Sequence, residues 1–397
     1  MSGQNRRRDL FLVLALLALG SVPDGMVYPA LKALTVDRFD IAIERASWFT
    51  LVPTLGALAF AFVLPKLTRR FSPLSMLRAA SVIEAAFLLS IELPIPYPAV
   101  IFLRFLSGAC DLAGIAATLR IAARVAASAE GESHRGRSMG AMGTSIMLGL
   151  LIGVGIGAVL SVPLILPVAA AALVVLALAT YLVERSAPSV HDADPQTIAD
   201  DVPAPVVRRE QITASLMFAC DRGLSAVLSL VVPLAFGGAD PSSKRLVGTV
   251  LGLSMLGMVL GGPFGGHLVD RFGALRMRVI GSVLFGLGTL GIVLAAPLGG
   301  AVMIVMATIT GLAAAPLFAS ALAIGTQHRG ATGVFGAIQA AGQAGYALGG
   351  ASLLLAKPAS LGAPETLAAS AIVYVALNVG MAYVLRGRIT GAAHRAQ

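Results

Sequence analysis

Long apolar runs separated by short polar connections dominate the chain. We count twelve runs, each close to the roughly 20 residues that an α-helix needs to cross a bilayer. Their approximate limits are 10–33, 46–64, 75–95, 98–124, 138–161, 163–183, 211–236, 246–269, 275–296, 299–325, 333–356 and 366–386. The runs are too long for barrel strands and do not alternate, and helices satisfy their own backbone groups in lipid. The pattern therefore predicts an all-α integral membrane protein with twelve transmembrane helices.

The first run follows Arg6-Arg7-Arg8, as the apolar part of a signal peptide would. No small-x-small cleavage site follows, and the apolar run continues to residue 33. We therefore expect a retained first span.

Composition agrees with a membrane location. Hydrophobic residues make up 57% of the chain and charged residues 12%, against about 25% charged residues in a soluble domain. The two cysteines, Cys110 and Cys220, lie inside apolar runs and suggest neither a disulfide framework nor a metal site.

The net charge of +9 could suggest a nucleic-acid partner, but its distribution argues against one. Of the 29 Lys and Arg residues, 21 fall in or beside the connections on one side of the predicted bundle, 6 fall on the other side, and Arg104 and Arg222 lie within spans. The side with 21 includes Arg278, which we place at the start of the ninth span. Basic residues concentrate in cytoplasmic connections, so both termini are expected in the cytoplasm. Arginine outnumbers lysine 25 to 4, which is typical of a GC-rich bacterium, so we expect a bacterial inner membrane.

The chain divides into two similar halves. The segment between residues 184 and 211 is polar and rich in Asp, Pro and Ala, which is typical of a flexible linker. We expect an N-terminal six-helix bundle over 1–184, a cytoplasmic linker over 185–211 and a C-terminal six-helix bundle over 212–397. Three pairs of similar segments support the repeat: Asp24 with Asp221 (offset 197), 66–75 with 267–276 (offset 201), and 133–136 with 327–330 (offset 194).

Acidic residues occur at membrane depth, where a carboxylate is costly and usually functional. Asp24 lies in the first span between Pro23 and Gly25, and Asp221 lies in the first span of the second half. We expect these two acids at a central site shared by the halves. Arg222 is about 100° around the helix from Asp221, so Asp221 is the better candidate to face the site.

Other charged residues extend this candidate site. Arg104, Gly108 and Asp111 share one face of the fourth span, and Arg104 needs an acidic partner: Asp24, Glu84 or, indirectly, Asp111. Glu84 has apolar neighbours that favour its protonated form, which suits a group that binds a proton on one side and releases it on the other. The alternatives are a static buried pair for Arg104 and a permanently protonated structural acid for Glu84.

Glycines at helical spacing follow in the fifth span, at Gly149, Gly153 and Gly157. Such a smooth face permits close packing and sliding between the halves, or serves ordinary helix packing. No catalytic triad, phosphate-binding loop or metal cluster is visible in the sequence, so we expect neither an enzyme nor a cofactor.

The connection after the eighth span is Gly266-His267-Leu268-Val269-Asp270-Arg271-Phe272-Gly273-Ala274-Leu275-Arg276. With the Arg-x-x-x-Gly element at 104–108 and the glycine ladder, it resembles the major facilitator superfamily, nearest to its drug/metabolite–proton antiporter branch. The resemblance implies two pseudo-symmetric six-helix bundles and a cytoplasmic gate made by Gly266, Asp270, Arg271, Gly273 and Arg276. Asp270 is expected to face a helix N-terminus, and Gly266 and Gly273 to let a neighbouring helix end approach.

The expected function is secondary active transport by alternating access. We expect a monomer that uses the proton gradient to export a small organic or amphipathic compound. Proton-linked uptake of a metabolite, a lipid flippase and a non-transporting membrane assembly factor are the alternatives.

Overall fold

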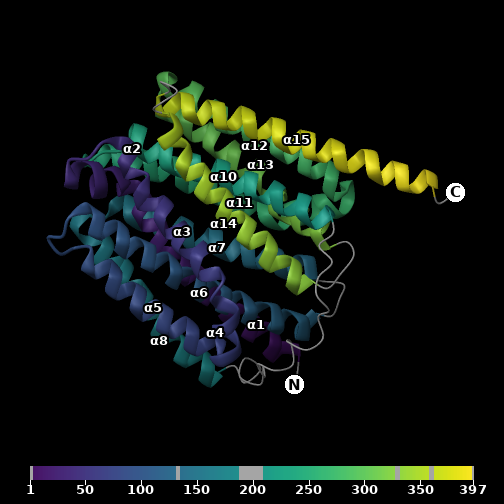
Figure 1. Cartoon of the computed structure of the whole chain (residues 1–397), viewed down its shortest axis with the longest axis horizontal. Helices are drawn as coiled ribbons and strands as arrows, with labels where there is room; N and C mark the ends of the chain where they lie inside the picture. The colour runs from purple at the N-terminus through teal and green to yellow at the C-terminus, as the bar shows by residue number, and fades with distance from the viewer. Residues whose placement is uncertain (1–2, 131–134, 187–208, 327–330, 357–361, 396–397) are drawn as a thin grey trace. The chain divides into compact units, whose positions relative to one another are not determined.

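The computed structural model describes residues 3–130, 135–186, 209–326, 331–356 and 362–395, and every regular element in these ranges is helical. The long helices are α1 (Gly3–Val27), α3 (Trp48–Ala61), α5 (Pro73–Ser90), α6 (Tyr97–Glu130), α7 (Arg135–Val159), α8 (Val162–Ser186), α10 (Arg209–Phe236), α11 (Pro241–Phe272), α12 (Ala274–Ala295), α13 (Gly300–Thr326), α14 (Ala331–Ala356) and α15 (Ala363–Arg395). Figure 1 shows them along the chain.

Ten helices of the described residues are long and apolar enough to cross a membrane. The other two predicted spans correspond to α3, which has only 14 residues, and to α14. The all-helical class predicted from the apolar runs is therefore confirmed.

Contacts divide the chain into two compact units. One comprises residues 1–205 with 232–252, and the other comprises 206–231 with 253–397. The predicted linker falls mostly at 187–208, outside the described residues, as does the repeat anchor at 327–330. The boundaries of the predicted halves stay a prediction.

In the first unit, α1 and α7 meet backbone to backbone. A Cβ atom added to Gly149, Gly153 or Gly157 would lie 1.9–2.2 Å from the carbonyl oxygens of Ala18, Val22 or Met26. The ladder thus packs inside its own half, which corrects the expectation that this face lets the two halves slide. Small residues allow such close helix contact in membranes, where no hydrophobic effect drives association.

The second unit repeats this crossing. A Cβ at Gly345 of α14 would meet the carbonyl oxygen of Ala219 of α10 at 1.9 Å, and one at Gly349 would meet that of Gly223 at 2.1 Å. These contacts fit an offset of 201 between α1 and α10, with Ala219 in the place of Ala18, or an offset of 197, with Ala219 in the place of Val22. The predicted equivalence of Asp24 and Asp221, with its offset of 197, stays a prediction.

The end of α1 and the start of α11 each have a distinctive local structure. After α1 the chain continues as a 3₁₀ turn at Tyr28–Ala30 and a π-helical stretch at Ala33–Asp37. At the start of α11, hydrogen bonds from Ser242 and Ser243 to the exposed Asp240 carboxylate hold the pKa of Asp240 below its ordinary value.

We predict that Gly153→Ala destabilises the protein by roughly 1–3 kcal/mol, because the added methyl group forces α1 and α7 apart. Thermal unfolding of the purified protein in detergent would measure the loss. Gly155→Ala is the matched control, since a Cβ there meets nothing within 4 Å among the described residues. Equal unfolding temperatures for both variants would contradict the role of the crossing.

Candidate functional site

Glu84 is the central acid of the first bundle. It lies on α5, only 7% exposed, and its Oε1 accepts a 2.9 Å hydrogen bond from the hydroxyl of Ser107 on α6. The helical register of α6 places Arg104 one turn from Ser107, and the Arg104 Nη1 donates to the same hydroxyl oxygen at 3.4 Å. The hydroxyl thereby links the carboxyl to the guanidinium.

Arg104 itself is held against α3. Its Nε donates to the carbonyl oxygen of Phe49 at 3.3 Å, and its guanidinium carbon lies 4.9 Å from the Phe49 ring centroid. The guanidinium is therefore positioned by a backbone oxygen and an aromatic face as well as by Ser107. Of the partners expected for Arg104, Glu84 is the one that the bridging hydroxyl reaches.

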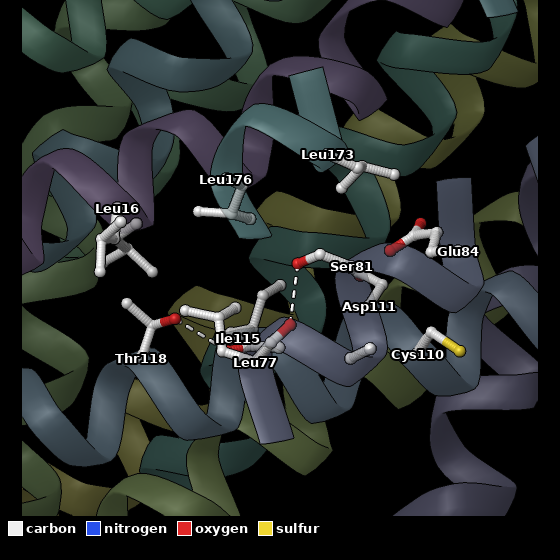
Figure 2. Close-up of a pocket in the computed structure, with 14 residues that line it drawn as sticks. Leu16, Leu77, Ser81, Glu84, Cys110, Asp111, Ile115, Thr118, Leu173 and Leu176 are labelled. Atoms are coloured by element: carbon white, nitrogen blue, oxygen red, sulfur yellow. Dashed lines mark hydrogen bonds between the residues drawn. The ribbon is translucent and has the colours of Figure 1, made fainter. Parts of the chain in front are cut away.

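A cavity opens beside Glu84, between α1, α5, α6 and α8 (Figure 2). Its volume is about 20 Å³, measured as the space open to the centre of a water molecule. Its walls are mainly aliphatic side chains, and its polar lining is Ser81, Glu84, Cys110, Asp111 and Thr118. In Figure 2, Glu84 and Cys110 gather at one end, while Leu16 and Thr118 lie at the other. We call this space the first-half cavity.

The remaining acids of the first bundle lie nearby. Asp111 lines the first-half cavity, and the half-buried Asp24 of α1 lies within electrostatic range of Glu84. Gly108, between Arg104 and Asp111, touches α3, because a Cβ there would lie 1.8 Å from the carbonyl oxygen of Pro53. Four of the predicted site residues, Asp24, Glu84, Arg104 and Asp111, thus cluster within one bundle.

In the second bundle the predicted acid has a different environment. Asp221 of α10 forms a two-pronged ion pair with Arg278 of α12, through Nη1–Oδ2 and Nη2–Oδ1 distances of 2.6 and 2.8 Å. The hydroxyl of Tyr374 on α15 donates a further 2.7 Å hydrogen bond to Asp221 Oδ1. Both oxygens of the Asp221 carboxylate therefore accept hydrogen bonds from its own bundle.

Arg278 has its donors satisfied as well. Its side chain is fully buried, and it donates to Asn378 Oδ1, to Asp221 and to the carbonyl oxygens of Met217 and Leu317. A buried charge needs such a complete set of partners. This corrects the assignment of Arg278 to a cytoplasmic connection.

One feature of the sequence could have indicated that Arg278 has partners inside the bundle. Arg78 and Arg278 stand at an offset of 200, close to that of the repeat. In the first unit Arg78 donates to Thr180 at 3.0 Å and to Glu184 at 2.6 Å, both on α8, which lies alongside α5 (Figure 1). Each arginine thus donates to a neighbouring helix of its own bundle, Arg78 to α8 and Arg278 to α10 and α15.

Arg222 does not join the Asp221 pair. It is partly buried, and its guanidinium carbon lies 5.2 Å from the ring centroid of Tyr346 on α14. The preference for Asp221 over Arg222 as the cavity-facing residue stays a prediction.

The predicted gate lies at the α11–α12 turn. Asp270, Arg271 and Arg276 are exposed, and Gly273 has a φ of +88°, which favours glycine. Among the described residues nothing lies within 4 Å of a Cβ added to Gly266 or Gly273. The close approach expected there occurs instead at Gly265, where a Cβ would lie 2.9 Å from the backbone of Ala315.

We predict that Arg278→Met destabilises the second bundle strongly, by roughly 3–5 kcal/mol, because it leaves the Asp221 carboxylate buried without its cation. Arg278→Met combined with Asp221→Leu should recover much of the loss. Thermal unfolding in detergent measures both variants, and Arg276→Gln on the same helix is the control because Arg276 is exposed. A neutral Arg278→Met would contradict the analysis of this network.

Comparison with known proteins gives the family. The family model described as Major Facilitator Superfamily matches residues 10–350. No curated protein matches the chain. Among solved structures, the crystal structure of nucleoside transporter NupG is similar, with a TM-score of 0.69 and 11% identity, covering 96% of this chain and 98% of that one. The antiporter branch expected from the motifs is not distinguished by these matches. The chain belongs to the major facilitator superfamily and is a membrane transporter, not an enzyme.

Proposed function

We propose that the protein is a proton-coupled transporter of a small organic solute and that Glu84 carries the coupled proton. The observation that supports this role is the contrast between the two bundles. Asp221 has an arginine partner and a tyrosine hydroxyl on its carboxylate, whereas Glu84 accepts a hydrogen bond from the neutral hydroxyl of Ser107 and borders a cavity. A carboxylate held by a guanidinium is stabilised in its ionised form, and an apolar setting favours the neutral form.

Arg104 provides a means of releasing the proton. A cation near a carboxyl favours ionisation, and Ser107 is shared between the two groups. Small movements of α6 relative to α5 would change the distance between the guanidinium and the carboxyl. In alternating access, such a movement would couple proton release to the change of accessible side.

Transport in proteoliposomes under an imposed pH gradient would show whether the protein exports or imports its solute. Export of an organic or amphipathic compound is our first candidate, with the partly buried Asp24 and Arg222 contributing to solute binding. Transport of a nucleoside-like metabolite is the second, favoured by the structural similarity to a nucleoside transporter. Nucleosides are therefore the first compounds to screen in proteoliposomes with a pH gradient.

We predict that Glu84→Gln abolishes proton-driven accumulation while exchange of solute across the membrane continues. The amide keeps the shape of the side chain and the Ser107 contact but binds no transferable proton. Accumulation and counterflow in proteoliposomes separate the two activities. Glu92→Gln is the matched control, because Glu92 lies just after α5 but pairs with Arg38 at 3.3 Å and does not line the cavity. Undiminished accumulation by Glu84→Gln would refute the proposal.

Asp24→Asn tests the second acid of the cluster. We expect it to lose coupled transport while its thermal unfolding stays near that of the parent protein, because Asp24 is only partly buried. Solute accumulation against a gradient measures the coupling. A variant that still concentrates solute would remove Asp24 from the mechanism and leave Glu84 as the coupling acid.

A further inference from the structure

A short helix, α4 (Leu64–Arg70), joins α3 to α5 in the first bundle (Figure 1). It lies on the side that the distribution of basic residues predicts to be cytoplasmic. Leu64 and Leu67 of this helix are half-buried, whereas Lys66 and Arg70 are exposed. Residues four apart share a helix face, so the two cations lie side by side. Like charges at this spacing repel each other, and a bound anion would relieve the repulsion.

Arg120 of α6 brings a third positive charge to this helix. Its Nη1 donates a 2.8 Å hydrogen bond to the carbonyl oxygen of Thr68, in the last turn of α4. Thr68 lies between Lys66 and Arg70, so three basic residues either belong to α4 or bind its backbone. The sequence has no Asp or Glu between residues 45 and 83, so this part of the chain supplies no counter-charge of its own.

Hydrogen bonds also fix the backbone that follows α4. The amide of Phe71 donates to the carbonyl oxygen of Leu67 at 2.9 Å. The amide of Ser75 donates to the hydroxyl oxygen of Ser72 at 3.2 Å, which caps the start of α5. The exposed cations are therefore presented by an ordered backbone that α5 and α6 hold in place.

Exposed apolar side chains flank α4 in the chain. Phe62 and Val63, which precede it, are 85% and 45% exposed, and Phe71, which follows it, is 46% exposed. Exposed apolar groups next to cations, at the end of a membrane span, suit the boundary between lipid headgroups and acyl chains. The surface around α4 thus combines positive charge with apolar contact area.

The corresponding connection of the second bundle differs in charge. Residues 66–71 match 267–272 at the offset of 201, and Phe272, 45% exposed, stands where the first connection has Phe71. Counting Lys, Arg, Asp and Glu, residues 66–71 carry three positive charges and no negative one, whereas 267–272 carry one of each because of the exposed Asp270. The aromatic position is kept in both connections, and the net positive charge belongs to the first.

We propose that the exposed face of α4 binds the phosphate group of an anionic phospholipid in the adjoining leaflet. Lys66 and Arg70 would donate charge-assisted hydrogen bonds to the phosphate oxygens, and the charge of Arg120 would strengthen the attraction. Phe62 and Phe71 would contact the acyl chains, which a soluble phosphate does not have. This inference goes beyond the proposed function and does not require proton coupling.

Binding of phosphatidylglycerol to the purified full-length protein in detergent, measured by native mass spectrometry, tests the proposal. We expect phosphatidylglycerol to bind at least about tenfold more tightly than phosphatidylcholine, whose headgroup has no net charge. Lys66→Gln combined with Arg70→Gln should remove this preference and leave the unfolding temperature without lipid unchanged, because both side chains are exposed. Arg271→Gln, at the position equivalent to Arg70 but beside Asp270, is the matched control and should keep the preference.

Equal binding of the two lipids by the parent protein, or an undiminished preference in the double variant, would overturn the proposal. A charge-preserving variant, Lys66→Arg combined with Arg70→Lys, should bind phosphatidylglycerol like the parent. Binding as weak as that of the glutamine variant would show that positive charge is not what the lipid recognises.

Two measurements on the parent protein test the proposal without any substitution. Raising the salt concentration from about 0.05 M to about 0.5 M should weaken phosphatidylglycerol binding, because salt screens exposed charges. Binding that does not depend on salt would overturn the electrostatic site. Inorganic phosphate should not displace the bound lipid, and complete displacement would identify a soluble anion as the ligand and overturn the assignment to a lipid.

Discussion

An ionised group inside a membrane bundle has to find its partners within that bundle, because lipid offers none. The structure meets this constraint in two ways. In the second bundle Arg278 brings every donor to an oxygen, and Asp221 is neutralised at hydrogen-bonding distance. In the first bundle Arg104 and Glu84 share the hydroxyl of Ser107. One arrangement is suited to rigidity, and the other leaves a carboxyl whose charge can change.

This difference shows that the two bundles of a repeated fold can share their helix packing and differ in their polar interactions. Both bundles keep the same helix crossings, since the glycine contacts of α1 with α7 recur in α10 with α14. The charged residues between the crossings differ, with the Arg278–Asp221 ion pair in the second bundle and the Glu84–Ser107 hydrogen bond in the first. The shared contacts preserve the arrangement of the helices, while the polar interactions inside each bundle differ.

Much of the architecture followed from the sequence, because apolar runs of spanning length leave few alternatives to a helical bundle. The repeat followed as well, since turn motifs at 66–75 and 267–276 share an offset of 201. The side-chain partners did not follow. Hydropathy does not specify how each helix is rotated, so Arg278, close to the predicted start of its span, was assigned to the connection. The match of Asp24 with Asp221 rests on residue type alone, and the glycine contacts fit offsets of 197 and 201 equally. Ser107, which joins Glu84 to Arg104, has no distinctive sequence pattern.

The backbone contact of α1 with α7 also limits how the first bundle can deform. Carbonyl oxygens of Ala18, Val22 and Met26 rest on successive glycines with no side chain between them. Such an interface resists both axial displacement and rotation, because either movement drives an oxygen into the neighbouring main chain. The two helices should behave as one stiff lever, and flexing of this bundle should be concentrated at the seam of α5 and α6, where Glu84 meets Ser107.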